Sequence, residues 1–247
     1  MKNIAMRLMY DGTNYHGWQF QKNALTVQQV LEEALSKLTG EEIKVTGCSR
    51  TDAGVHALDY VMNFKTNTNI PPEKLPYALN YHLNRGITAV EAWEAEEDFN
   101  ARFSSKGKRY VYNIWNGRVR NPFYADYSWY LPYRIDVEKM KAASGYFVGK
   151  HDFSAFMAAG GSQKTTVRTV RHCSVTENEE NKGLIRVSVE ADAYLYNMVR
   201  IMTGTLAEVG LGRIEPEDIP RIIESGDRRE SGLTAPPEGL FLKKVYY

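Results

Sequence analysis

Cysteines and metal-binding spacings are scarce in this sequence. Only two cysteines, Cys48 and Cys173, occur among the 247 residues, and they form no Cys-x-x-Cys pair. This excludes a redox motif or a zinc ribbon, and we expect two reduced, buried thiols. The five histidines follow no His-x-x-x-His spacing, and neither a P-loop nor a complete Gly-x-Gly-x-x-Gly motif is present. The sequence therefore predicts no metal and no nucleotide cofactor.

Long hydrophobic runs and an excess of one charge are also missing. No apolar stretch approaches the roughly 20 residues that cross a bilayer. Residues 1–10 show neither the apolar core nor the cleavage site of a secretory signal, so we expect a cytoplasmic protein without membrane contact. The 31 Lys plus Arg and 30 Asp plus Glu leave a net charge of +1, and 43% of the residues are hydrophobic. These proportions are typical of a globular chain with one large domain or two small ones.

Hydrophobic periodicity and turn residues divide the chain into alternating strands and helices. A helix at residues 27–38 has Thr26 as its N-cap and Gly40 just after its end. In the first half we predict strands at residues 2–10, 42–48, 57–64 and 87–93, and a second helix at 71–83. In the second half we predict strands at residues 108–115, 172–176, 185–190 and 240–247, and helices at 137–147, 197–211 and 216–225. Residues 1–104 and 105–247 then each form a split β-α-β, ferredoxin-like half of an α+β protein.

Basic residues gather in two stretches that contain no acidic residue. The basic residues are Arg102, Lys106, Lys108, Arg109, Arg118 and Arg120 in the first stretch, and Lys164, Arg168 and Arg171 in the second. Aromatic residues are interleaved with the first stretch, namely Phe103, Tyr110, Tyr112 and Trp115. Cations that bind phosphates, beside aromatics that stack on unpaired bases, are typical of an RNA-binding surface. The alternative is a solvated strand edge whose aromatics lie in the core.

The segment Arg50-Thr51-Asp52-Ala53-Gly54 lies in a loop between two predicted strands. A loop on a rigid sheet is where functional side chains are often presented, so Asp52 is a candidate catalytic carboxylate. The alternative is an aspartate that caps a turn, with Arg50 as an ordinary surface charge.

Arg200 falls in the first turn of the helix predicted to start near Asn197. The helix dipole disfavours a cation there, so Arg200 is expected to have an anionic partner, and Gly204 one turn later would leave room beside its guanidinium. If Asp52 were that partner, the pairing would favour an ionised carboxylate able to act as a nucleophile or base. The alternative is a routine surface salt bridge.

A set of motifs in the same order along the chain strongly resembles the tRNA pseudouridine synthase A family. In the first half they are Tyr10-Asp11-Gly12-Thr13-Asn14-Tyr15-His16-Gly17-Trp18-Gln19, Thr26-Val27-Gln28 and Arg50-Thr51-Asp52-Ala53-Gly54-Val55-His56-Ala57. Further along they are Phe99-Asn100-Ala101-Arg102, Lys108-Arg109-Tyr110-Val111-Tyr112, His151-Asp152-Phe153-Ser154, Leu195-Tyr196-Asn197-Met198-Val199-Arg200 and Ala235-Pro236-Pro237-Glu238-Gly239-Leu240. The chain departs from the expected pattern at Asp59-Tyr60 and Tyr194, which could alter substrate preference.

The resemblance implies an isomerase that converts uridine to pseudouridine at nucleotides 38 to 40 of the tRNA anticodon stem-loop, without cofactor or metal. It implies that Asp52 is the catalytic aspartate, that Arg50 helps hold the flipped nucleotide, that Tyr110 stacks on the base, and that Arg200 pairs with Asp52. The RNA-contacting residues would be Tyr110, Arg109, Lys108, Arg102, Lys164 and Arg168. It also implies a homodimer, and a continuous, mixed, mainly antiparallel eight-stranded sheet with helices on one face.

Two other functions fit parts of the sequence. An RNA-binding protein without chemistry would use the same basic and aromatic residues, but it would have no need of Asp52. An aspartate-based hydrolase of small molecules would use Asp52, but the chain shows no second carboxylate at a recognisable spacing.

Overall fold

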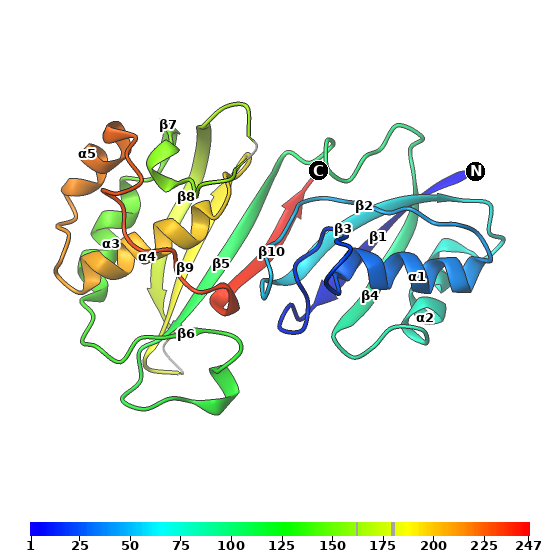
Figure 1. The fold of residues 1–247 in the computed structure, drawn as a ribbon, viewed down its shortest axis with the longest axis horizontal. Coiled ribbons are helices and arrows are strands. Elements are labelled where there is room, and N and C mark those ends of the chain that lie inside the picture. The colour runs from blue at the N-terminus through cyan, green and yellow to red at the C-terminus, as the bar shows by residue number, and fades with distance from the viewer. Residues whose placement is uncertain (162, 179–180) are drawn as a thin grey trace. The chain divides into compact units, whose positions relative to one another are not determined.

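The computed structural model describes residues 1–161, 163–178 and 181–247, which fall into two compact units (Figure 1). Unit 1 contains Met1–Lys106 and Phe241–Tyr247, and unit 2 contains Gly107–Leu240. The division thus follows residue 106, close to the expected boundary after residue 104. The last strand was expected in the C-terminal half, but most of it belongs to unit 1, because it hydrogen-bonds in parallel along the strand that starts at His56.

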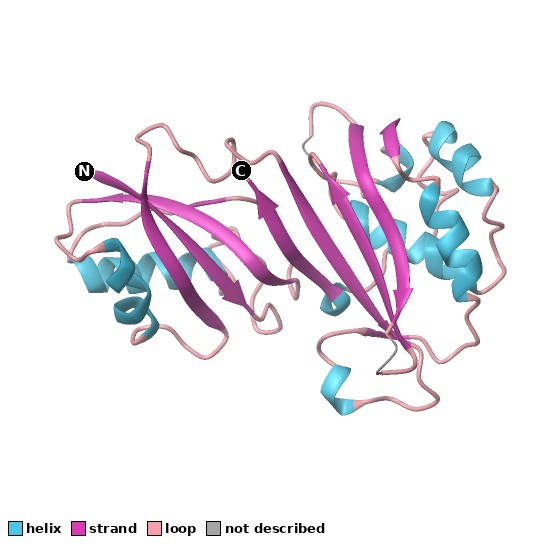
Figure 2. Cartoon of the chain, turned by 180° about the vertical axis from the view of Figure 1, so that it is seen from behind, coloured by secondary structure: helices cyan, strands magenta, loops and turns pink. Residues whose placement is uncertain are grey.

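The sheet of unit 1 is built on strand β1 (Lys2–Tyr10), which pairs antiparallel with β3 (His56–Thr66) and β4 (Ile87–Ala95). Strand β10 (Leu240–Tyr246) lies parallel to β3 on its other side. Helices α1 and α2 cover one face of this sheet in Figure 1, and Figure 2 shows the opposite face. The pairing of β1 with both β3 and β4 is the split β-α-β order predicted from the sequence.

Helix α1 (Val27–Thr39) begins and ends as its sequence predicts. The Thr26 hydroxyl accepts a hydrogen bond from the Gln29 amide at 3.3 Å, and Gly40 closes the helix in the left-handed conformation with φ +73°. Leu31 and Leu35 are fully buried. Local capping and periodicity are therefore sufficient to define this helix.

The strand predicted at residues 42–48 is much shorter in the structure, where only β2 (Thr46–Gly47) pairs with β3. The backbone before it is held by helix α1 instead. The Ile43 amide donates to Ser36 Oγ at 3.0 Å, and the Val45 amide donates to Glu32 Oε1 at 3.1 Å. Apolar residues in this segment therefore face the core without joining the sheet.

The second predicted helix is shorter than expected. A 3₁₀ turn, η1 (Pro72–Lys74), leads into α2 (Leu75–Asn80), which ends before Leu83. The Asn80 side chain bonds both backbone groups of Ala89, at 2.9 and 2.8 Å, and so ties the end of the helix to β4. This long-range contact stops a helix that periodicity alone would extend.

Unit 2 contains an antiparallel sheet in the order β5 (Gly107–Trp115), β9 (Leu184–Ala191), β8 (Val167–Glu177), β7 (Gly149–Asp152). A short strand, β6 (Trp129–Tyr130), lies parallel to β5. The sheet is accompanied by α3 (Val137–Gly145), α4 (Met198–Gly210), α5 (Asp218–Ser225) and the 3₁₀ turns η2 (Pro122–Tyr124), η3 (Ser154–Phe156) and η4 (Pro237–Gly239). Figure 1 shows α4 in front of β8 and β9, with α3 to the left of these strands.

The α+β class with mixed, mainly antiparallel pairing is confirmed. The described residues contain ten strands where eight were predicted, and two of the ten, β2 and β6, have two residues each. Strand β7 was not predicted, because its sequence Gly-Lys-His-Asp lacks the alternation of apolar residues that marks a strand. No helix within residues 1–161, 163–178 and 181–247 is both long and apolar enough to cross a membrane.

Helix α4 is the most buried helix of unit 2. Met198, Met202, Leu206 and Val209 recur at helical spacing and form a buried stripe along this helix. Burial also extends beyond this stripe, to Thr203, Gly204 and Thr205. A helix that is buried on several faces must be covered by more than the sheet.

Candidate active site

The loop that carries Asp52 is held by the loop that follows β1. The Trp18 amide donates to the Thr51 carbonyl at 3.2 Å, and the Gly54 amide donates to the Tyr15 carbonyl at 3.2 Å. These two bonds fall on either side of Asp52. The two motifs that lie far apart in the sequence are thus joined backbone to backbone in unit 1.

Two glycines make this close approach possible. A Cβ atom at Gly12 would lie 2.1 Å from the Val55 carbonyl oxygen, and one at Gly17 would lie 2.2 Å from the Thr51 carbonyl oxygen. Gly17 also has φ +79°, a conformation that side chains rarely adopt. Glycine is therefore required at both positions by the backbone of the Asp52 loop.

We expect Gly17→Ala to destabilise the protein by about 3–5 kcal/mol, because it combines left-handed strain with a backbone clash. Gly40→Ala is the matched control, since Gly40 has φ +73° but nothing within 4 Å of the added Cβ. It should cost about 1–2 kcal/mol. Urea unfolding measures both variants, and equal losses would show that the contact with Thr51 is unimportant.

Aromatic side chains pack against the Asp52 loop and bond to its backbone and side chains. The Trp18 and Tyr60 rings stack with centroids 4.1 Å apart, and the Tyr60 hydroxyl donates to the Ser49 carbonyl. The Tyr10 hydroxyl is hydrogen-bonded to Thr51 Oγ1 at 2.9 Å. Tyr60 is fully buried. Its side chain therefore supports the loop from the protein interior and is not accessible to RNA.

The two candidate residues on this loop differ in exposure. Asp52 is half-buried and Arg50 is exposed. The Asp52 carbonyl accepts a hydrogen bond from the Val55 amide at 3.2 Å, and Gly54 completes the turn with φ +78°. A carboxylate on a backbone fixed at this many points is pre-positioned, as a nucleophile or base requires.

Tyr110 lies on β5 in unit 2 and is 6% exposed. Its ring meets the ring of Tyr194 edge to face, with centroids 4.9 Å apart. The Tyr194 hydroxyl has one proton to donate and lies 2.7 Å from the Lys108 carbonyl oxygen and 2.9 Å from the Val189 carbonyl oxygen. Burial raises the pKa of Tyr194 well above its usual value, so this hydroxyl stays protonated and able to donate. Tyr194, the second departure from the family pattern, thus fixes the plane of the Tyr110 ring.

Arg200 occupies the first turn of α4, as predicted. Asn197, the residue before the helix, has φ +60° and is the one non-glycine with positive φ among the described residues. The Arg200 guanidinium donates from Nη1 to Asn197 Oδ1 at 2.9 Å and from Nε to the Ala235 carbonyl at 2.7 Å. The expectation for Gly204 is corrected: its missing Cβ leaves room for the Leu233 carbonyl, which would lie 1.8 Å from such an atom.

The basic residues do not share one environment. Arg102 belongs to unit 1, whereas Lys108, Arg109, Lys164 and Arg168 belong to unit 2. Arg102 and Lys164 are exposed, and Arg168 is half-buried. Arg109 forms an ion pair with Glu190 at 2.6 Å, and Lys108 is only 9% exposed. Tyr110 and Tyr112 are buried too. This agrees with the alternative interpretation, in which the aromatics of this stretch lie in the core.

Both cysteines are buried, as predicted. Burial raises the pKa of the Cys173 thiol to about 12, so it stays protonated at neutral pH. The thiols therefore act as small apolar core residues.

Sequence reasoning missed the supporting residues of the site. Trp18 and Tyr60 beneath the Asp52 loop, and Tyr194 beside Tyr110, were not assigned a role. Their signal in the sequence is weak, because a buried aromatic is an ordinary core residue until its partner is known.

Two split β-α-β units, one with a rigid carboxylate loop and the other with an arginine fixed at a helix N-terminus, have the architecture expected of an α+β pseudouridine synthase. A family model described as tRNA pseudouridine synthase matches residues 6–104 and 143–247. The chain belongs to this family, which confirms the resemblance seen in the motifs. Asp52 and Arg200 lie within the matched ranges, and Lys108, Arg109 and Tyr110 lie between them.

Curated relatives match over their whole length. The chain is 51% identical to "tRNA pseudouridine synthase A" of Thermoanaerobacter sp. (strain X514), with 100% of both chains covered. It is 48% identical to the protein of the same name from Acetivibrio thermocellus and 48% identical to "tRNA pseudouridine synthase A 2" of Clostridium perfringens, again over 100% of each chain.

Proposed function

We propose that this protein converts uridine to pseudouridine at nucleotides 38 to 40 of the tRNA anticodon stem-loop, with Asp52 as its essential carboxylate. Its family supports the isomerase activity on tRNA. The observation that carries the assignment of Asp52 is the clamped loop. Backbone bonds to Trp18 and Tyr15 hold Asp52 from both sides while its side chain is only half-buried.

The target uridine is stacked in the stem and must leave it before it can react. Flipping a base costs a few kcal/mol, and stacking it on an aromatic side chain returns about 1–3 kcal/mol. We assign that contact to Tyr110, whose ring loses little further freedom because Tyr194 already restrains it. Phosphates are assigned to Arg102, Lys108, Arg109, Lys164 and Arg168, as the resemblance implies.

The reaction breaks the bond between uracil N1 and ribose C1′, forms a bond between C5 and C1′, and releases the C5 hydrogen to water. Asp52 could attack C1′, attack C6, or remove a ribose proton to give a glycal. Each route needs an ionised carboxylate, which a nearby guanidinium favours. Arg200 is assigned that role, and Arg50 is assigned to hold the flipped nucleotide.

Three further properties belong to the proposal. The protein is expected to act in the cytoplasm, as a homodimer, and without a cofactor. Sedimentation equilibrium of the purified protein tests the dimer directly.

Tritium release from tRNA labelled at uracil C5 tests the proposed function, because rejoining at C5 must expel that hydrogen. The wild-type protein is expected to release tritium from unmodified tRNA, and analysis of the product should place the pseudouridine at nucleotides 38 to 40. Tight binding of tRNA without release would favour the RNA-binding alternative. Absence of both would contradict any action on tRNA.

A further inference from the structure

Arg228 organises the loop that follows α5. Its Nη1 donates to Ser231 Oγ and to the Gly232 carbonyl, both at 2.9 Å, and its Nη2 donates to Thr234 Oγ1 at 3.0 Å. Within the described part of the chain, none of its partners is a carboxylate. These three acceptors are neutral and follow Arg228 by a few residues in the chain. The guanidinium therefore holds the loop in its folded conformation.

That loop, residues 231–235, forms a strap across helix α4. The Gly232 amide donates to Thr205 Oγ1 at 2.9 Å. A Cβ at Gly232 would lie 2.7 Å from the Thr205 backbone, and the Leu233 carbonyl fills the space left by Gly204. The strap therefore lies directly against the helix backbone and cannot move closer to it.

The end of the strap holds Arg200 by two reciprocal bonds. The Ala235 amide donates to the Arg200 carbonyl at 3.1 Å, and Arg200 Nε donates to the Ala235 carbonyl at 2.7 Å. The position of the Ala235 carbonyl thus sets the direction of the guanidinium. Just beyond this end of the strap, the Tyr112 hydroxyl donates to the Pro236 carbonyl at 2.7 Å and so fixes the chain after Ala235.

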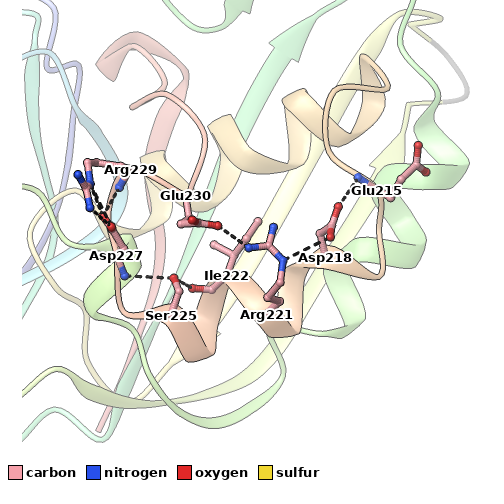
Figure 3. Close-up of polar contacts among 8 residues, drawn as sticks. All are labelled: Glu215, Asp218, Arg221, Ile222, Ser225, Asp227, Arg229 and Glu230. Atoms are coloured by element: carbon pink, nitrogen blue, oxygen red, sulfur yellow. Dashed lines mark hydrogen bonds and ion pairs between the residues drawn. The ribbon is translucent and has the colours of Figure 1, made fainter.

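Charged residues near Arg228 in the sequence form ion pairs with one another, and Figure 3 shows two of these pairs. Arg221 pairs with Glu230, and Arg229 pairs with Asp227. Both arginines of these pairs are exposed, and exposed pairs contribute little to stability. Arg221 therefore offers a control arginine near Arg228 in the sequence, and its ion-pair partners, Asp218 and Glu230, lie outside the strap.

We propose that Arg228 is a positioning residue for Arg200, acting through the strap of residues 231–235. This rests on the proposed function, in which Arg200 acts beside Asp52. A guanidinium can reach Ser231, Gly232 and Thr234 at once because its donors form a planar fork. A lysine carries its donors on one nitrogen, whereas Arg228 reaches these acceptors from two, Nη1 and Nη2. Arg228→Lys should therefore keep the charge and lose the positioning.

Tritium release and tRNA binding test the proposal on three single variants. Arg228→Lys and Arg228→Gln are expected to lower kcat about 10-fold, in line with the cost of a misplaced catalytic group, while the Kd for tRNA changes less than about twofold. Arg221→Gln should keep the wild-type kcat. A normal kcat in Arg228→Lys, with an impaired Arg200→Lys, would overturn the positioning role and leave the proposed function standing.

A double variant separates positioning from a general loss of stability. In an Arg200→Lys background, Arg228→Lys is expected to have little further effect on kcat, because the group that it positions is already gone. Additive losses would overturn the proposal. If Arg200→Lys is fully active by itself, the role of Arg200 in the proposed function fails, and the proposal fails with it.

Amide hydrogen exchange gives a readout that does not depend on turnover. In Arg228→Lys the Ala235 amide should exchange at least about 10-fold faster than in the wild type, while the amides in the middle of α4 keep their protection. Unchanged exchange at Ala235 would contradict the idea that Arg228 holds the strap. If Arg228→Gln does not fold, Arg228→Lys still allows both measurements.

Discussion

Asp52→Asn is expected to abolish turnover and to leave tRNA binding nearly intact. Asparagine has almost the same shape as aspartate, so the clamped backbone around residue 52 should not change. The amide is neither a nucleophile nor a base, and all three chemical routes need a carboxylate. We expect kcat for tritium release to fall at least about 10³-fold.

The measurement pairs single-turnover tritium release with a filter-binding Kd for tRNA. Asp98→Asn is the control, since Asp98 is an exposed aspartate elsewhere in unit 1 and should behave as the wild type. Substantial release by Asp52→Asn would remove Asp52 from the mechanism. A large loss of binding with normal turnover of the bound tRNA would assign Asp52 to recognition instead.

Arg200→Ala should lower both stability and rate. The variant leaves the Ala235 carbonyl and the Asn197 side chain without the donors that satisfy them. Hydrogen bonds from a charged group are worth about 1.5–3 kcal/mol each, so we expect the loss of these two to cost about 3–6 kcal/mol. The rate should fall as well, because Asp52 would lose the guanidinium proposed as its partner.

Urea unfolding and tritium release distinguish these two effects of Arg200→Ala. Arg213→Ala is the matched control, because Arg213 pairs with Glu208 at the other end of α4 and is largely exposed. Its loss should cost less than about 1 kcal/mol and leave the rate unchanged. A destabilised Arg200→Ala variant with an unchanged kcat would limit Arg200 to a structural role.

The elements that could be predicted are those with local signals. Helix α1 follows from Thr26, Gly40 and the spacing of its leucines, all within a few residues of the helix itself. The stripe of α4 follows from its periodicity in the same way. The Asp52 loop could also be singled out, because an ordered series of motifs in one chain is far more specific than any one of them.

The errors arose where a distant contact overrides a local preference. Residues 42–45 alternate polar and apolar side chains, as a strand does. The amides of Ile43 and Val45, however, donate to side chains of α1 and not to a neighbouring strand. Helix α2 stops at Asn80 because β4 binds the side chain of that residue. The partners lie too far along the chain for a pattern of neighbours to indicate them.

Exposure of the basic stretch could not be predicted either. The spacing of its charges is the same whether they bind phosphates or other residues. In the structure Lys108 is buried and Arg109 is paired with Glu190, whereas Arg102 and Lys164 are exposed. Cross-strand neighbours decide this, and those neighbours come from another part of the sequence.

The sequence by itself determined the family, the α+β class, most of the helices and strands, and the candidates Asp52, Tyr110 and Arg200. These follow from motifs, capping residues and periodicity, which act over a few residues of chain. The tertiary structure alone decided what holds the candidates in place: the loop around Gly17 for Asp52, the Tyr194 ring for Tyr110, and the strap at Ala235 for Arg200. Those supports depend on close backbone approach and packing between distant segments, and such contacts exist only once the chain has folded.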